Sequence, residues 1–330
     1  MSYNMKKVFI AILAVAALAS CNKSEVIETP KGAAIAFDNA FVDNATKASD
    51  HTKDNLQDFG VYGSVEANNT SGIIFNNTRV YKSDGAFAYN DVQYWIASAQ
   101  YYFTAFAPYT GAKWVYTTAT DKAAQTGTLS IDNAAAGASQ DLLYAYTKPD
   151  KTPEAITTQP AKVGFTFKHM LSKVAFKFVN GFAENSNITL KVYDVVISNT
   201  AAKGEMTVTE GVDGNWTGTN DLSLTFGPAT ADEATVIAEN NGEYATPHFY
   251  LIPVSREYQI SFKVDLIQAG VKVATYDHPV KMVVNLAKGT NYCLSATLNN
   301  DNVNPESQLF PIEFKVDSVE GWTEGPVTLQ

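Results

Sequence analysis

Apolar side chains alternate with polar or small ones along most of the 330-residue chain, and this alternation constrains the fold more than any other feature. Val174, Phe176 and Phe178 form one such run, with Lys173 and Lys177 on the opposite face. Similar runs lie at residues 35–37, 101–105, 165–167, 188–192, 222–226, 260–266, 280–284, 294–298 and 312–316. Successive side chains of a strand point to opposite faces, so the pattern indicates antiparallel strands with one buried face. We therefore expect an all-β fold built of β-sandwiches.

A proline-rich stretch at residues 148–162 indicates a domain boundary. It holds Pro149, Pro153 and Pro160 among threonines and lysines, a composition typical of linkers. A chain of this length accommodates about two domains at roughly 150 residues each. We expect an N-terminal domain over residues 33–150, a linker over 151–162 and a C-terminal domain over 163–330.

The first residues have the features of a secretory signal. Lys6 and Lys7 precede an uncharged apolar run over residues 8–18, and Leu-Ala-Ser-Cys ends the segment at Cys21. The run is too short to span a bilayer, which needs about 20 residues. This sequence is typical of a bacterial lipoprotein signal peptide over residues 1–20, with acylation of Cys21. The alternative is an ordinary secretory signal that happens to carry a cysteine. Residues 21–32 are polar, and we interpret them as a flexible tether.

Cysteine content and net charge argue against a disulfide-stabilised protein and against a nucleic-acid-binding protein. Cys293 has no partner once Cys21 carries lipid, so we expect a small buried residue there and no disulfide framework. The chain has a formal net charge of −10, which becomes −12 once the two lysines of residues 1–20 are removed. Nucleic-acid binding needs a basic face, so we expect no nucleic-acid partner.

No catalytic motif stands out in the sequence. It contains no nucleophile elbow, phosphate loop, dinucleotide fingerprint or zinc-protease motif. The histidines, His51, His169, His248 and His278, are too scattered for a metal site. We expect no catalytic residues, no metal and no cofactor, and we interpret the chain as a non-enzyme. A glycosidase or protease remains the weaker alternative.

Aromatic residues gather between positions 94 and 116. We interpret this cluster as the core of the first sandwich, because Tyr101, Phe103 and Ala105 alternate. The alternative is a sugar-binding platform, and Tyr102 and Phe106, on the opposite face, are where we expect such a surface.

Several segments, taken in order and spacing, resemble the fimbrillin-like lipoprotein family, whose members are subunits of type V pili in Gram-negative anaerobes. The resemblance covers nearly all of the mature chain and rests on residues 35–48, 58–62, 94–95, 102–108, 141–145, 165–174, 312–314 and 321–322. It implies two transthyretin-like antiparallel β-sandwich domains of Greek-key type. It also implies export to the outer membrane and the cell surface, with the lipid on Cys21 as the anchor.

The resemblance further implies a maturation cut and strand exchange between subunits. In the family a protease cuts after a basic residue and removes the first strand, and a strand of another subunit fills the groove. The matching positions are Lys47 and Ala48, where the family pattern has arginine in place of lysine, and the removed strand would be residues 33–42. The alternative is that Lys47 is an ordinary solvent-exposed loop lysine with no role in maturation.

The donor strand is expected within residues 309–330. The apolar side chains expected to enter the groove are those of Ile312, Phe314, Val316, Trp322, Val327 and Leu329. The alternative is that residues 312–316 complete the chain's own sandwich and only the segment after Gly321 donates.

These inferences predict a structural subunit of an adhesive cell-surface fimbria. The expected partners are other copies or related pilus subunits, the outer membrane through Cys21, and a host or bacterial surface glycan or protein. The main alternative is a monomeric surface lipoprotein that binds glycans.

Overall fold

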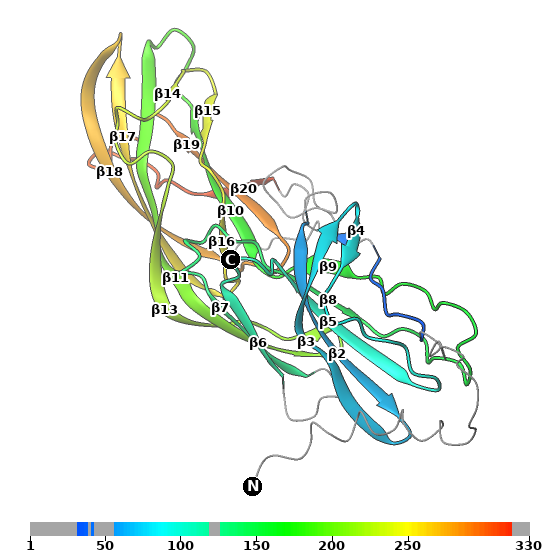
Figure 1. The fold of residues 1–330 in the computed structure, drawn as a ribbon. Coiled ribbons are helices and arrows are strands. Elements are labelled where there is room, and N and C mark those ends of the chain that lie inside the picture. The colour runs from blue at the N-terminus through cyan, green and yellow to red at the C-terminus, as the bar shows by residue number, and fades with distance from the viewer. Residues whose placement is uncertain (1–31, 39–40, 43–55, 119–125, 319–330) are drawn as a thin grey trace, which may run out of the picture. The chain divides into compact units, whose positions relative to one another are not determined.

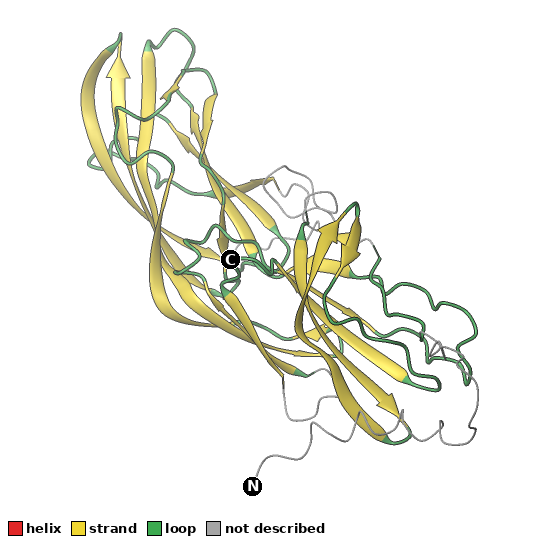
Figure 2. Ribbon diagram, in the orientation of Figure 1, coloured by secondary structure: helices red, strands yellow, loops and turns green. Residues whose placement is uncertain are grey.

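The computed structural model describes residues 32–38, 41–42, 56–118 and 126–318 of the chain. Figure 2 shows these residues as strands and connecting loops, with no helix among them. Nothing in these ranges is therefore a helix of the length and apolarity that a membrane crossing requires. The expected all-β class is confirmed.

The first sheet has seven strands within the described residues, and β5 lies in its middle (Figure 1). In spatial order they are β1 (Phe41–Val42), β9 (Thr166–His169), β8 (Leu143–Thr147), β5 (Gln100–Ala107), β2 (Asp58–Ala67), β3 (Thr70–Ser83) and β4 (Ala86–Ala88). Neighbouring strands are antiparallel except β1 and β9, which run parallel. Among the described strands, β1 is thus a short edge strand with β9 as its one partner.

The second sheet is organised around the long strand β11 (Ile188–Thr209). Its main path within the described part of the chain is β18 (Val271–Val284), β17 (Arg256–Gln268), β11, β7 (Gly127–Asp132) and β6 (Trp114–Thr118). Three further strands pair with β11, namely β12 (Val212–Asp213), β13 (Thr217–Phe226) and β14 (Val236–Ile237). β18 is an edge strand of this sheet.

A third sheet carries the end of the described chain. Its order is β15 (Gly242–Ala245), β10 (Ser172–Asn180), β19 (Asn291–Leu298) and β20 (Lys315–Ser318), and β16 (Phe249–Leu251) also pairs with β10. β10 and β19 run parallel, whereas β19 and β20 are antiparallel. β20 is therefore an edge strand, and the described residues end with it.

Buried side chains of the second and third sheets share one core, the arrangement of a β-sandwich. Phe176 and Phe178 of β10 pack with Phe262 of β17, and all three are buried. Val174, Phe176 and Phe178 are buried as expected, but the opposite face is not solvated along the whole strand, because Lys173 and Ala175 are each 2% exposed. A separate core joins residues 35 and 37 to the first sheet.

The sheets do not divide at the expected linker. β9, which follows residues 151–162, pairs with β8, which precedes them. Conversely, β7 of the expected N-terminal domain pairs with β11 of the expected C-terminal domain. The reason is that Phe165 and Phe167 pack against Phe59, with ring centroids 5.7 and 5.5 Å away, so the chain returns to the first core after the prolines. The division into two domains stays a prediction.

Candidate strand-exchange site

Residues 33–38 form a strand-like segment that joins two distant parts of the chain. On one side the Ile35 amide donates to the Gln93 carbonyl at 2.8 Å, and the Trp95 amide donates to the Ala33 carbonyl at 2.9 Å. On the other side the segment pairs with Val163. The Val163 amide donates to the Ala36 carbonyl at 2.8 Å, and the Asp38 amide donates to the Val163 carbonyl at 2.9 Å. Alternate backbone groups of the segment therefore bond to opposite neighbours.

Phe37 lies at the centre of the first core and is only 2% exposed. Five aromatic rings have centroids within 6.3 Å of its own. They belong to Phe59, Phe75, Tyr89, Phe103 and Phe165. Ile35, two residues earlier, is 1% exposed and points into the same core. Burial of each of these two side chains contributes about 1.5–3 kcal/mol. Apolar packing therefore supplies a large part of the free energy that keeps residues 33–38 in place.

Two side chains also hold the segment by its carbonyl groups. The Tyr89 hydroxyl donates to the Ile35 carbonyl at 2.7 Å, and the Gln159 side chain donates to the Ala34 carbonyl at 2.7 Å. Burial raises the pKa of Tyr89, so its hydroxyl stays a donor at neutral pH. The backbone, side-chain and ring partners named above all come from residues that follow Lys47.

The predicted lipidation and maturation residues lie outside the described residues. They are Cys21, the expected lipid-bearing residue, and Lys47 and Ala48, the expected maturation site. The described chain stops after β1 at Val42 and resumes at Leu56, which is 1% exposed. A cut after Lys47 would thus fall between the buried first segment and the rest of its core.

The structure places the first expected donor residues in the chain's own core. Ile312 and Phe314 are 6% and 7% exposed, and Phe314 packs against Phe176, Phe178 and Phe262 at centroid distances of 5.3, 5.8 and 6.0 Å. This matches the alternative in which they complete their own sandwich. The backbone of Val316 pairs with Leu294 in β20. Trp322, Val327 and Leu329 lie outside the described residues.

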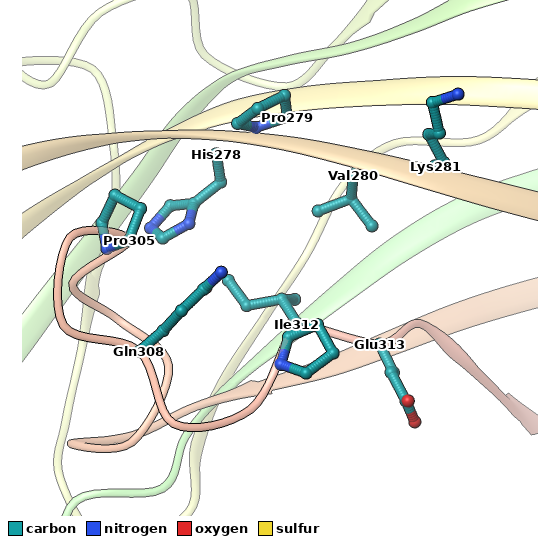
Figure 3. Close-up of a pocket in the computed structure, with 9 residues that line it drawn as sticks. His278, Pro279, Val280, Lys281, Pro305, Gln308, Ile312 and Glu313 are labelled. Carbon is teal, nitrogen blue, oxygen red and sulfur yellow. The ribbon is translucent and has the colours of Figure 1, made fainter.

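A cavity of about 470 Å³ lies between β18 and residues 305–313, which lead to β20 (Figure 3). His278 lines this cavity. Its side chain is 3% exposed and stacks on Phe262, with ring centroids 5.0 Å apart. Burial lowers the pKa of His278, and its interactions with the Val303 backbone and Asp277 oppose this. Proline and aliphatic side chains line much of the rest, so the cavity lacks the converging acids of a hydrolase.

The expected surface at Tyr102 and Phe106 does not exist in the structure, which corrects that prediction. Phe106 has no exposed surface and packs among Tyr62, Trp114, Tyr116 and Tyr144. Tyr102 is 8% exposed. Its hydroxyl donates to Glu66 at 2.8 Å, and the Lys148 ammonium lies 4.8 Å from its ring centroid. Both faces of β5 are covered, so alternation on this strand did not mean a wet face.

The exposed aromatic residue in this region is Tyr94, which the sequence pattern had grouped with the core. Val92, Tyr94 and Ile96 are 49%, 47% and 43% exposed, and we call these three residues the outer stripe. Trp95 points inward instead, with its ring 4.6 Å from that of Tyr101. The alternation of residues 92–96 was the signal that could have separated Tyr94 from Trp95.

Ionisable groups do not gather into a metal or catalytic centre in the part of the chain that the structure describes. No group of three or more His, Cys, Asp or Glu side chains there could hold a metal ion. Asp141 and His169 form one buried pair, with 2.9 Å between the carboxylate oxygen and Nδ1. Cys293 is half-buried on β19 and forms no disulfide.

Comparison with known proteins identifies the class and then the family. Residues 5–22 match the prokaryotic membrane lipoprotein lipid attachment site, which supports the lipoprotein signal that ends at Cys21. The fold is similar to that of a fimbrial protein from Bacteroides vulgatus, with a TM-score of 0.62 at 16% identity over 88% of this chain and 99% of that one. The chain is thus an all-β lipoprotein with the fold of a fimbrial protein.

Two other solved structures are less similar. A candidate cell adhesion protein from Bacteroides ovatus has a TM-score of 0.46 at 18% identity, covering 89% of this chain and 99% of that one. The fimbrial anchor protein Mfa2 from Porphyromonas gingivalis has a TM-score of 0.36 at 9% identity, covering 86% and 96%. No curated protein sequence matches this chain. The fimbrillin-like family matches residues 46–310, which is most of the sequence, so the chain belongs to the fimbrillin-like family.

Proposed function

We propose that this chain is a structural and adhesive subunit of a cell-surface fimbria, exported to the outer membrane as a lipoprotein acylated at Cys21. Subunits join when residues 33–42 are cut away after Lys47 and a strand of another subunit takes their place. The observation that carries this proposal is the position of Phe37, which fills a pocket of five aromatic rings from a segment that a single cut would release.

Loss of the first segment would leave the core open in two ways. The aromatic rings around Phe37 would meet water, and the backbone groups of Gln93, Trp95 and Val163 would lose their partners. Unpaired edges and exposed apolar surface both favour an added strand. The segment is held by regular backbone hydrogen bonds and by two buried apolar side chains. Another strand with apolar side chains at the same two positions could therefore bind in the same groove.

The tail supports the donor role through its sequence and its place in the chain. Residues 312–318 belong to the chain's own third sheet and core, so the donor would start after β20. The twelve residues 319–330 contain Val319, Trp322, Val327 and Leu329 as apolar teeth. At about 3.3 Å per residue, this is long enough to span the part of the groove that residues 33–38 occupy. The work of such a subunit is mechanical and adhesive, without turnover.

Mass spectrometry of the surface filaments tests the proposal. Subunits in purified filaments should begin at Ala48, and a Lys47→Ala variant should reach the membrane uncut and form no filaments. Lys53→Ala, which changes a nearby lysine, is the matched control and should be cut and assembled normally. Filaments whose subunits keep an intact acylated Cys21 and residues 33–42 would rule out exchange at this site.

A further inference from the structure

The structure fixes what any replacement for residues 33–38 must supply. Positions 35 and 37 must carry apolar side chains, because Ile35 and Phe37 point into the core. Positions 35 and 38 must donate amide hydrogens, to Gln93 and Val163. The amide of Ala34 is different. Within the described residues it donates no hydrogen bond, so position 34 accepts a proline at no cost in pairing.

One stretch of the tail meets all these requirements in a single register. Residues 325–330 read Gly-Pro-Val-Thr-Leu-Gln, with Val327 and Leu329 two residues apart. Laid on residues 33–38 in the same chain direction, Val327 takes the place of Ile35 and Leu329 that of Phe37. Pro326 then takes the place of Ala34, the position whose amide is not used. The amides at positions 35 and 38 come from Val327 and Gln330, so both hydrogen bonds can form again.

The outer face of the groove agrees with this register. Ala34 pairs with Tyr94 across the outer side, where the small alanine leaves Tyr94 47% exposed. Polar residues normally occupy the outward positions of a solvated sheet, as Glu257, Gln259 and Ser261 do on β17. An exposed apolar run such as the outer stripe therefore marks an interaction surface. In the proposed register the ring of Pro326 would cover Tyr94 on this face.

The segment that carries the outer stripe has anchors of its own besides its hydrogen bonds to residues 33 and 35. The Ile96 amide donates to the Tyr101 hydroxyl at 2.6 Å, and the Thr152 hydroxyl donates to the Ile96 carbonyl at 2.6 Å. Trp95 also anchors the segment in the core through its ring contact with Tyr101. The stripe would thus stay in place after the first segment leaves.

The same sequence pattern occurs a second time in the chain, in a place where the structure shows what it does. Residues 311–315 read Pro-Ile-Glu-Phe-Lys, and residues 326–330 repeat the order proline, apolar, polar, apolar, polar. In the first of these, Ile312 and Phe314 are buried among phenylalanine rings of their own core. The pattern is therefore one that fills an aromatic core as an added edge segment.

From these observations we propose that residues 325–330 of a second copy of this chain replace residues 33–38 in the same direction. Val327 and Leu329 fill the Ile35 and Phe37 positions, and Pro326 covers Tyr94. Trp322, on the same outer face as Pro326, becomes a diagonal neighbour of Ile96. This register rests on the proposed function, because it needs the first segment to leave.

Thiol cross-linking in intact filaments tests the register. The full-length chain carries Cys293→Ser, so that the introduced cysteines are the free thiols, together with Tyr94→Cys and Pro326→Cys. A short bifunctional thiol reagent should then join neighbouring subunits into a covalent ladder. Tyr94→Cys with Val327→Cys is the matched control, because residue 327 points to the opposite face and should give at least tenfold less ladder. Tyr94→Cys with Pro311→Cys tests the other copy of the pattern and should give none.

Each other outcome has a definite meaning. A ladder from Tyr94→Cys with Val327→Cys would mean that the true register is shifted by one residue. A ladder from Tyr94→Cys with Pro311→Cys would mean that residues 311–315 are the donor. Either result overturns the inference. Filaments that begin at Ala48 but give no ladder with any pair would assign the groove to a different protein and overturn it as well. Filaments that retain residues 33–42 would instead contradict the proposed function itself.

Discussion

Phe37 and Phe165 are stacked, with ring centroids 5.9 Å apart and ring planes 17° apart. One of these residues lies before the expected maturation site and the other lies more than a hundred residues after it. The first core is therefore completed by a residue that a cut after Lys47 would separate from the rest of that core. This relationship leads to predictions for both the uncut chain and the filament.

Phe37→Ala should destabilise the uncut chain and leave the filament unchanged. Removing a buried phenylalanine costs about 3–5 kcal/mol of unfolding free energy, since a cavity opens among the surrounding rings. Denaturant unfolding of the full-length chain measures this loss. Filaments should have normal stability, because the proposed cut after Lys47 removes residue 37 from mature subunits. Phe314→Ala is the control and should weaken both forms; a filament weakened equally by Phe37→Ala would contradict the account.

Leu329→Phe should strengthen assembly. The Phe37 pocket is shaped for an aromatic ring, and a leucine in its place would leave part of that volume empty. A phenylalanine at the donor position restores the ring contacts, each worth about 0.5–1.5 kcal/mol. The temperature at which purified filaments dissociate should rise. Thr328→Phe adds a ring on the opposite face and serves as the control. An unchanged or lower dissociation temperature for Leu329→Phe would argue against the register.

Asp58 should contribute stability that disappears in acid. Burial alone would raise the pKa of its carboxyl group, but hydrogen bonds from Thr110, Arg79 and the Tyr109 amide lower that pKa below its ordinary value. Because the pKa of Asp58 is lower in the folded chain than in the unfolded chain, its ionised carboxylate stabilises the fold at neutral pH. This stability is lost as the pH falls below about 4. Asp58→Asn should therefore reduce the unfolding free energy by about 1–3 kcal/mol at pH 7.

The pH dependence separates this charge effect from simple disruption. The difference in unfolding free energy between wild type and Asp58→Asn should shrink as the pH drops below about 4. Asp150→Asn changes an exposed carboxylate and should have little effect at any pH. A constant difference from pH 7 to pH 3 would show that Asp58 acts through shape and not through its charge.

His278 should make the fold less stable in mild acid. Burial lowers its pKa below the ordinary value of about 6.5, so the unfolded chain binds the proton more readily than the folded one. The unfolding free energy should fall as the pH drops below about 6.5, until the folded histidine itself becomes protonated. His278→Gln should flatten this slope between pH 7 and 5, and His248→Gln, at an exposed position, should not. Equal slopes in all three proteins would contradict this role.

Sequence alternation predicted which residues are buried better than it predicted their partners. Phe176 and Phe178 were expected on one buried face, and both have no exposed surface on β10. The strand at Phe165 and Phe167 was also expected, but in the second domain. Alternation fixes the two faces of a strand, whereas its neighbours depend on pairing with distant segments. The return of β9 to the first sheet therefore could not be read from the local pattern.

The candidate site was only partly visible in the sequence. The first strand and the tail were found through the family resemblance, and the burial of Ile35 and Phe37 agrees with the expected strand. The error at Phe106 has a physical cause. Alternation predicts a solvated face only when a second layer does not cover it, and Trp114 and Tyr116 cover the other face of β5.

The most direct test of the account is a structure of the native filament at side-chain resolution. The account predicts that each groove lined by Phe59, Phe75, Tyr89, Phe103 and Phe165 holds residues of the neighbouring subunit's tail, with the groove's own chain starting at Ala48. A groove that still holds Ile35 and Phe37 of its own chain would contradict the account.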